Sequence, residues 1–312
     1  MSIEILIATP IYPATLAALG QTYTAHHLWQ APDRGALLAD LKDRARAIVT
    51  SGGAGADARL INALPKAEII ACFGVGYDAI DLDAARVRNM AVTNTPDVLT
   101  DDVADLALAL ILDSQRRISR GDRYVRTGKW VKGGMELGTA LTGRKLGIVG
   151  LGRIGLATAR RAEACGMKIA YHGPRKKNAV PYAYVDSLVE LAKDCDILCL
   201  TLPGGTGTRH LVNAEVLAAL GPQGTLVNVA RGSIVDEAAL VAALQSGALG
   251  AAALDVFEDE PRVPEALLTM ENVVLQPHVG SATHGTRAAM GQLVLDNLAA
   301  HFAGRALPTR VA

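Results

Sequence analysis

Aromatic residues are scarce in this chain of 312 residues, where 2 Trp, 7 Tyr and 3 Phe make up 4% of the total. Because half of the residues are nevertheless hydrophobic, the core must consist mainly of small aliphatic side chains, which allow helices to pack closely on sheets. The same hydrophobic content excludes an intrinsically disordered chain, since enough apolar surface is available to offset the chain entropy.

The chain also lacks net charge, because 31 Lys and Arg balance 31 Asp and Glu. We therefore expect no nucleic-acid partner and no anionic membrane partner, both of which favour a basic excess. No apolar run approaches the roughly 20 residues of a membrane span. The first residues carry an acid and no basic stretch, so we expect no signal peptide and a cytoplasmic location.

Cysteine is rare, and no two cysteines form a CxxC pair. Four cysteines in a chain of this length do not indicate a disulfide scaffold, and we expect reduced structural thiols. Metal binding by Cys195 and Cys199 would place them four residues apart on a helix, but the residues between them are typical of a strand. We therefore predict no metal site.

Short β-branched runs alternate with helical stretches, first over residues 3–94 and again from Lys145 onward. This rhythm predicts an α/β fold with parallel sheets. We expect two doubly wound lobes, one flavodoxin-like and one Rossmann-type. Residues 101–119 are expected to form a long helix, and the polar, glycine-rich segment 121–143 a connection or protrusion.

The last predicted helix, residues 283–304, follows a second set of strands and helices that is already complete. The first lobe is incomplete without one more helix, so we expect this helix to return to it. The predicted domains are therefore 1–97 with 284–312, and 98–283.

The run Gly150-Leu151-Gly152-Arg153-Ile154-Gly155 is a GxGxxG pattern between a predicted strand and a predicted helix. In that context the pattern indicates a dinucleotide site, so of the two predicted domains 98–283 would bind NAD(P) and 1–97 with 284–312 would bind the substrate. The first glycine permits the tight turn, the second lets the backbone approach a pyrophosphate, and the third packs the helix on the strand. The positive end of the helix dipole then favours the anion.

The segment after the next strand predicts the form of the cofactor. An NAD site usually carries Asp or Glu here, but residues 170–177 contain no acid and include Arg175, Lys176 and Lys177. Arg and Lys would attract a 2′-phosphate, so we predict NADPH/NADP+ with weaker use of NADH. His172 and Gly173 are expected beside the ribose. The alternative is a solvated basic turn without a ligand.

Three polar residues follow predicted strands in the second half of the chain, namely Arg231, Glu260 and His278. In a doubly wound sheet the carboxyl ends of the strands line the ligand site. Reduction of a 2-keto acid needs a cation for the carboxylate and keto oxygen and an acid to protonate that oxygen. Arg supplies the first, His the second, and a carboxylate beside the His would orient it.

With these motifs, the chain resembles the D-isomer-specific 2-hydroxyacid dehydrogenase family. The matching segments are 150–155, 229–237, 253–261 and 276–283. The resemblance implies that Arg231 binds the substrate carboxylate and keto oxygen, and that Glu260 pairs with the proton donor His278.

Two further segments carry the resemblance into the first half of the chain. Residues 73–78 are similar to the family's substrate loop, and residues 95–100 to its hinge. The resemblance therefore implies substrate contacts from Val75, Gly76 and Leu99, beside Arg231 and His278. It also implies further cofactor contacts from Thr100, Leu202, Pro203, Val229, Ala230, Asp255 and Ser281.

Residues 94–105 and 122–130 are similar to those of NADPH-dependent glyoxylate/hydroxypyruvate reductases and the plant hydroxyphenylpyruvate type. Those enzymes usually carry a Ser-Arg-Ser/Thr turn where this chain has Gly173-Pro174-Arg175, so the 2′-phosphate contact is expected to pass to Arg175 and Lys176. The expected activity is the reduction of glyoxylate and hydroxypyruvate, small anionic 2-keto acids, to D-2-hydroxy acids.

Other functions and features stay open from the sequence. One alternative is another NAD(P)-linked D-2-hydroxyacid dehydrogenase, of the phenylpyruvate, D-lactate or phosphoglycerate type; another is a non-catalytic NAD(P)-sensing corepressor.

A homodimer through residues 98–143 is expected, with Trp130 or Met135 reaching the partner's active site. Arg116, Arg117 and Arg120 are expected to form a solvated helix face or a dimer surface. Surface positions are expected for His26, His27, His210 and His301.

Overall fold

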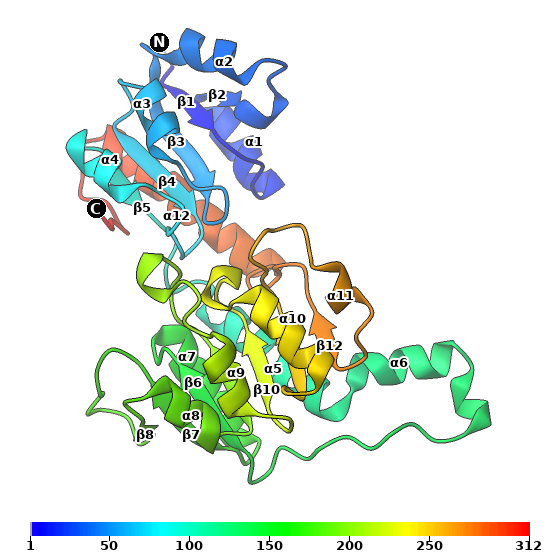
Figure 1. The fold of residues 1–312 in the computed structure, drawn as a ribbon. Coiled ribbons are helices and arrows are strands. Elements are labelled where there is room, and N and C mark those ends of the chain that lie inside the picture. The colour runs from blue at the N-terminus through cyan, green and yellow to red at the C-terminus, as the bar shows by residue number, and fades with distance from the viewer. Residues whose placement is uncertain (1) are drawn as a thin grey trace. The chain divides into compact units, whose positions relative to one another are not determined.

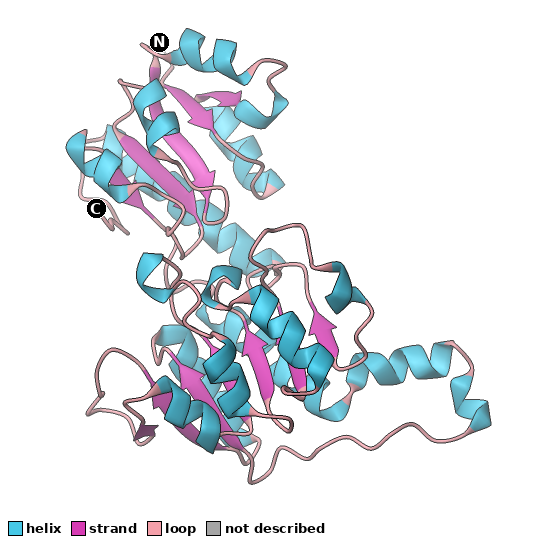
Figure 2. Ribbon diagram, viewed as in Figure 1, coloured by secondary structure: helices cyan, strands magenta, loops and turns pink. Residues whose placement is uncertain are grey.

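The computed structural model describes residues 2–312, drawn in Figures 1 and 2. The chain divides into two compact units. Unit 1 contains the residues up to Leu99 together with Ser281–Ala312, and unit 2 contains Thr100–Gly280. The predicted boundaries, 97/98 and 283/284, differ from these by two and three residues. The roles assigned to the two domains stay predictions.

Unit 1 is built on a five-stranded sheet with the order β2-β1-β3-β4-β5, in which every strand pair is parallel. This order is that of flavodoxin-like folds. The strands are β1 (Glu4–Ile7), β2 (Thr24–His27), β3 (Ala45–Ser51), β4 (Ile69–Phe73) and β5 (Ala91–Thr93).

Helices cover both faces of this sheet. The helices are α1 (Pro13–Thr22), η1 (Leu28–Gln30), α2 (Arg34–Leu41), α3 (Ala58–Ala63), α4 (Leu82–Val87) and α12 (His284–Phe302). A buried cluster joins α2, α3 and α4 to alternate residues of the strands, while α1 and α12 pack together and α12 lies against β4. The last helix, α12, belongs to unit 1 together with the residues up to Leu99.

Unit 2 is built on a seven-stranded parallel sheet with the order β12-β11-β10-β9-β6-β7-β8. If β6 to β12 are numbered 1 to 7 and the sheet is followed from β8 to β12, the order is 3-2-1-4-5-6-7. This order contains the Rossmann order 3-2-1-4-5-6, and it reverses between β6 and β9. The strands are β6 (Lys145–Val149), β7 (Lys168–His172), β8 (Ala183–Tyr184), β9 (Ile197–Leu200), β10 (Thr225–Asn228), β11 (Ala251–Leu254) and β12 (Val273–Leu275). Ligands in such sheets bind at the carboxyl ends of the strands, at the point of reversal.

The helices of unit 2 begin at a side-chain cap in several cases, as Ser187, Asn213 and Asp236 accept hydrogen bonds from the first turns of α8, α9 and α10. The helices are α5 (Thr100–Arg116), α6 (Ile118–Arg126), η2 (Lys129–Lys132), α7 (Arg153–Ala164), α8 (Leu188–Asp194), η3 (Thr206–Thr208), α9 (Ala214–Leu220), η4 (Gly232–Ile234), α10 (Glu237–Ser246) and α11 (Glu265–Leu268).

Small residues allow the close packing that the composition predicts. A Cβ on Gly147 in β6 would lie 2.9 Å from Sγ of Cys195, and a Cβ on Gly291 in α12 would lie 2.0 Å from Oγ1 of Thr15. The predicted α/β fold with two parallel sheets is therefore confirmed, and its cores consist mainly of Ala, Val, Leu and Ile.

The segment 121–143, for which the sequence predicts a connection or a protrusion, contains helical structure and protrudes from unit 2. The long helix ends at Arg116 because Arg117 adopts a left-handed conformation with φ 56°, and a second helix, α6, begins at once. In Figure 1, α6 and the segment after it extend away from the sheet of unit 2. Exposed apolar side chains lie along this arm, with Trp130 at 67%, Val131 at 90% and Leu137 at 88% exposure.

The three arginines at the base of the arm do not form a uniformly solvated face. Arg117 and Arg120 both pair with Glu136, and Nε of Arg120 lies 3.0 Å from Oε2 of Glu271. Arg116 is exposed. The ion pairs join α6 to the returning segment of the arm.

Candidate active site

The glycine-rich turn between β6 and α7 has the geometry that its sequence predicts. Gly150 has a φ of 93°, which favours glycine, and a Cβ there would lie 2.7 Å from that of Leu202. At Gly155 a Cβ would lie 2.4 Å from the carbonyl oxygen of Gly150. At Gly152 an added Cβ would meet no atom within 4 Å, so this position is open on the side where a ligand can approach.

At the amino terminus of α7 no side chain caps the first N–H groups, which leaves them available to an anion. Gly152 is its N-cap residue and supplies no side-chain hydrogen bond. Thr201, after β9, donates its hydroxyl hydrogen to the carbonyl oxygen of Gly150 at 2.8 Å and so holds the turn in place. The first N–H groups of a helix and its positive dipole end favour phosphate, so these residues fit a dinucleotide pyrophosphate.

The end of β7 carries a basic turn. Nδ1 of His172 lies 3.0 Å from the carbonyl oxygen of Val185. The turn that follows exposes Arg175 and Lys176, and the first acid after it is Asp186, whose Oδ1 lies 2.9 Å from the hydroxyl of Tyr184. No carboxylate is therefore offered at the strand end itself, which favours a 2′-phosphate over a free 2′-hydroxyl.

Arg231 follows β10 and is held by backbone contacts. Its Nη1 donates to the carbonyl oxygen of Ala230 at 2.7 Å, and its own carbonyl oxygen accepts from Nδ2 of Asn228 at 2.9 Å. At the next residue, Gly232, a Cβ would lie 1.8 Å from the carbonyl carbon of Phe257, so only glycine fits there. The Arg231 turn is thus fixed closely against the turn that follows β11.

Asp255, the first residue after β11, is 1% exposed and acts as a clamp. Its carboxylate accepts hydrogen bonds from the backbone N–H groups of Val279 at 2.7 Å and Gly280 at 2.9 Å. Its backbone carbonyl oxygen accepts a hydrogen bond from the backbone N–H of His278 at 2.8 Å. Burial raises the pKa of Asp255, although the two N–H donors oppose the shift. The clamp holds His278 in a left-handed backbone conformation, with φ 54°.

Glu260 and His278 form the polar pair that the sequence predicts. Oε2 of Glu260 lies 2.6 Å from Nδ1 of His278, and Oε1 accepts from the backbone N–H of Phe257 at 3.1 Å. Burial alone would raise the pKa of Glu260, but the contact with His278, the Phe257 N–H and the charge of Arg231 together hold it below its usual value. The carboxylate is therefore ionised at neutral pH and orients the imidazole, leaving Nε2 for another group.

In unit 1, the loop after β4 has carbonyl oxygens that are already engaged. The carbonyl oxygen of Gly74 accepts a hydrogen bond from the N–H of Thr95 at 2.9 Å, and the carbonyl oxygen of Val75 accepts one from Nδ2 of Asn94 at 2.8 Å. Within residues 2–312, the N–H groups of Val75 and Gly76 donate to no acceptor. An anion could accept hydrogen bonds from both of them.

The remaining predicted site residues lie as follows. Leu151 precedes Gly152, Ile154 lies in the first turn of α7, and Leu202 lies against Gly150. Val229 and Ala230 are buried after β10, and Leu99, which ends the first segment of unit 1, is 3% exposed. Pro203 follows β9, Thr100 begins α5, and Ser281 begins the second segment of unit 1. Arg153 begins α7.

Several positioning residues were missed because only distant parts of the chain reveal them. Asn228, Gly232 and Thr201 each hold a predicted site residue in place. His210 was expected at the surface, but it is partly buried and its Nε2 lies 2.8 Å from Oε1 of Glu258, two residues before Glu260.

The other three histidines are also only partly exposed. His26 and His301 lie 2.9 Å from Glu4 and 3.1 Å from Glu68, respectively. His27 packs edge-on against Trp29, with ring centroids 4.7 Å apart.

The cysteines are not arranged as a metal site. Cys199 lies in β9 and Cys195 follows α8, so the two do not share a helix. Burial raises the pKa of each of these thiols to about 12, which keeps them protonated and unreactive. Over residues 2–312, no group of three or more His, Cys, Asp or Glu could hold a metal ion, and no helix is long and apolar enough to cross a membrane.

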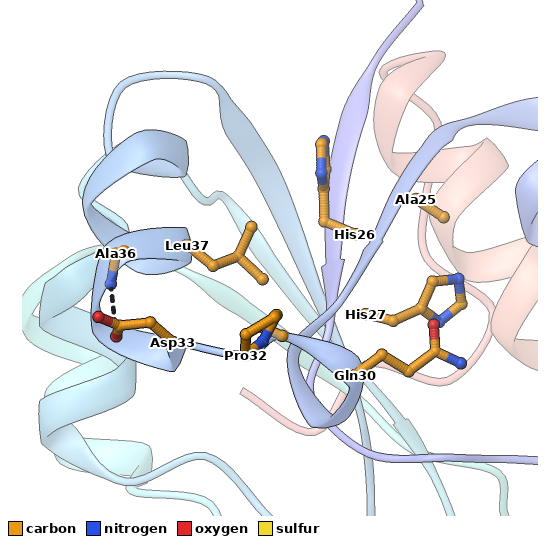
Figure 3. A pocket seen from close by; sticks show the side chains of 9 residues that line it. Ala25, His26, His27, Gln30, Pro32, Asp33, Ala36 and Leu37 are labelled. Carbon is orange, nitrogen blue, oxygen red and sulfur yellow. Dashed lines mark hydrogen bonds between the residues drawn. The ribbon is translucent and has the colours of Figure 1, made fainter.

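A hollow of about 550 Å³ lies in unit 1, beside β2 and α2. Figure 3 draws the side chains that line it. Asp33 on its wall accepts from the N–H of Ala36 at 3.0 Å and caps α2. None of the predicted site residues lines this hollow. The chemistry is therefore concentrated elsewhere, at the strand ends described above.

Residues 108–280 match the family model described as "D-isomer specific 2-hydroxyacid dehydrogenase, NAD binding domain". The chain belongs to this family. The predictions of the family and of a dinucleotide-dependent oxidoreductase are therefore confirmed, and the matched segment contains the glycine turn, Arg231, Glu260 and His278.

Full-length relatives agree with this assignment. The chain is 48% identical to glyoxylate/hydroxypyruvate reductase A of Arabidopsis thaliana and 49% identical to hydroxyphenylpyruvate reductase of Plectranthus scutellarioides, with 99% of each chain covered. A solved structure of NADPH-dependent glyoxylate/hydroxypyruvate reductase from Sinorhizobium meliloti, in complex with NADP and malonate, is 44% identical, with a TM-score of 0.92. The match covers 100% of this chain and 97% of that one.

Proposed function

We propose that this enzyme reduces small 2-keto acids, glyoxylate and hydroxypyruvate among them, to D-2-hydroxy acids with NADPH. The observation that carries the proposal is the pair of Glu260 and His278, 2.6 Å apart at the carboxyl end of the unit 2 sheet. The names of the Arabidopsis and Sinorhizobium relatives support the substrates and the cofactor.

His278 is the proposed proton donor. Because its Nδ1 lies against the carboxylate of Glu260, its Nε2 is the nitrogen available to the keto oxygen. The carboxylate of Glu260 orients the imidazole, which donates the proton to the alkoxide that develops on the substrate.

Arg231 is the proposed cation for the substrate carboxylate and keto oxygen. A guanidinium presents a planar fork of donors that matches a carboxylate in geometry as well as in charge. Its position is supported by the bond to Ala230 and by Gly232, which brings the Arg231 turn into contact with Phe257. In unit 1, Val75 and Gly76 offer N–H groups for the carboxylate, and Leu99 is proposed to contact the substrate.

The glycine turn fits the cofactor, which supplies the hydride when bound. Gly150, Gly152 and the first N–H groups of α7, at Arg153, Ile154 and Gly155, would hold the pyrophosphate. Arg175 and Lys176, with His172 and Gly173, would hold the 2′-phosphate. Contacts from Leu151, Leu202, Pro203, Val229, Ala230, Asp255, Thr100 and Ser281 belong to the same proposal.

A second candidate activity is the reduction of hydroxyphenylpyruvate, favoured by the 49% identity to the Plectranthus enzyme of that name. The two candidates share the same catalytic residues and differ in the size of the substrate. D-lactate and phosphoglycerate types are less favoured, because no acid is offered to a 2′-hydroxyl after β7. A corepressor would not need the whole Arg, Glu and His set.

The proposal also includes a homodimer and a cytoplasmic location. The exposed side chains of Trp130, Val131 and Leu137 support a homodimer through residues 98–143, because apolar patches of this kind mark protein interfaces. Light scattering of the full chain and of a Val131→Asp variant would test this. A cytoplasmic location remains a proposal from the sequence.

The direct test of the substrate and the cofactor is a matrix of steady-state measurements. kcat/KM is measured for glyoxylate, hydroxypyruvate and phenylpyruvate, each with NADPH and with NADH. We expect the highest values for the first two acids with NADPH. Cofactor binding without turnover of any of these acids would contradict the proposal and favour a sensing protein.

A further inference from the structure

Arg287, in the first turns of α12, is a partly buried cation whose neighbour is an aromatic ring. Its guanidinium carbon lies 5.6 Å from the centroid of the Phe73 ring, and Phe73 is 4% exposed. Within residues 2–312, no carboxylate lies within ion-pair distance of Arg287, and burial lowers its pKa without an opposing charge. A fully buried charge in a protein is usually paired with an opposite charge, and this half-buried guanidinium has an aromatic ring rather than a carboxylate as its neighbour.

The position of Arg287 indicates what the missing partner is. Phe73 is the last residue of β4, and the loop that begins after it carries the N–H groups of Val75 and Gly76, which have no acceptor within the described chain. Two residues of chain span at most about 7.6 Å between Cα atoms, so the guanidinium and these N–H groups share one end of the unit 1 sheet. Ligands of doubly wound sheets bind at this end.

We propose that Arg287 binds an acidic group on the tail of the substrate, and that the enzyme favours 2-keto acids with a second carboxylate over matched acids without one. This inference rests on the proposed function, in which the first carboxylate binds to Val75 and Gly76. The ring of Phe73 restricts the guanidinium, so that less conformational entropy is lost when the second carboxylate binds. The ligand carboxylate then supplies the counter-charge that the described residues of the chain do not.

The test compares two four-carbon acids that differ only in the terminal group, 2-oxobutanedioate and 2-oxobutanoate, with glyoxylate as an acid without a tail. Wild type is compared with Arg287→Met, which keeps the length of the side chain, and with Arg287→Lys, which keeps the charge. Arg305→Met, an exposed position in the same unit, is the matched control.

In Arg287→Met we expect kcat/KM for 2-oxobutanedioate to fall about tenfold or more, since charge-assisted hydrogen bonds are lost. The values for 2-oxobutanoate and glyoxylate stay within about twofold, Arg287→Lys recovers part of the loss, and Arg305→Met changes none of the three. Equal losses for all three acids would overturn the inference and make Arg287 a support of Phe73. An unchanged preference for the dicarboxylate would overturn it as well.

A failure of the proposed function itself gives a different result, in which wild type reduces none of the three acids. Calorimetric binding then decides the inference in the same variants. Weaker binding of 2-oxobutanedioate to Arg287→Met than to wild type, with no change for 2-oxobutanoate, would support the tail contact. Equal binding of both acids would overturn it.

Discussion

Nδ1 of His278 lies 2.6 Å from Oε2 of Glu260, although 18 residues separate the two along the chain. Two further contacts fix this pair, the clamp of Asp255 on the residues after His278 and the bond from the Phe257 N–H to Glu260. The pair orients the imidazole and keeps a negative charge beside it.

Replacement of Glu260 by Gln is expected to lower kcat for the reduction. The carboxylate accepts the hydrogen bond that orients the imidazole of His278, whereas an amide offers only an uncharged acceptor, so His278 is held less firmly for proton transfer. Steady-state kcat for hydroxypyruvate in wild type and Glu260→Gln, with saturating NADPH, measures this loss. An unchanged kcat would mean that Glu260 has no influence on the proton donor.

The same replacement has a predicted effect on stability, with a definite sign. The pKa of Glu260 is lowered in the folded chain, so its contribution is present above the ordinary glutamate value of about 4.3 and is lost as the pH falls through the lowered value. The difference in unfolding free energy between wild type and Glu260→Gln should shrink as the pH falls below 4.3. Denaturant titrations at pH 3 and pH 6 measure it.

Gly152→Ala is expected to weaken binding of NADPH without weakening the fold. The position has a φ of −78° and room for a Cβ, so the methyl group clashes only with what approaches the turn. We expect the Kd of NADPH to rise about tenfold and the Tm to stay the same. Gly20→Ala, at another open position, is the control. An unchanged Kd would mean that no pyrophosphate lies against Gly152.

A double variant, Arg175→Ala with Lys176→Ala, should change the choice between the two nicotinamide cofactors. Each basic group adds charge-assisted hydrogen bonds to a 2′-phosphate, worth about 1.5–3 kcal/mol together with their charge. We expect kcat/KM for NADPH to fall at least tenfold while that for NADH stays constant. Lys66→Ala together with Lys42→Ala, two exposed bases in unit 1, controls for the loss of two positive charges. Equal effects on both cofactors would show that the turn does not contact the 2′-phosphate.

Asp255→Asn is expected to destabilise the chain and disturb His278. The amide has one oxygen for the two N–H donors of Val279 and Gly280, so one buried donor loses its partner at a cost of about 1–3 kcal/mol. A lower Tm together with a lower kcat is the expected result. Asp43→Asn, at an exposed position, should change neither. A wild-type Tm in Asp255→Asn would show that the clamp contributes nothing.

Periodicity and motifs predicted most of the architecture and the residues at the strand ends. Strand β2 was missed because its sequence, Thr-Ala-His-His, has almost none of the β-branched and aromatic residues by which strands are recognised. The break at Arg117 was missed because no glycine or proline marks it; its backbone conformation is unusual for arginine.

Contacts between distant residues account for what the sequence could not predict of the site. The requirement for glycine at position 232 depends on Phe257, and the role of His210 depends on Glu258, 48 residues away. Arg287 lies just beyond a recognised motif, and only its contact with Phe73 distinguishes it from a surface arginine. Such properties follow from packing, which no local pattern contains.

The central claim is that His278 transfers the proton in the reduction of a 2-keto acid. Replacement by Gln keeps a polar side chain but removes the imidazole that gives up the proton. The decisive measurement is kcat for hydroxypyruvate in His278→Gln with saturating NADPH, with the Kd of NADPH measured in parallel by fluorescence. We predict a fall in kcat of roughly a hundredfold to ten-thousandfold with an unchanged Kd. A kcat near that of wild type would contradict the account.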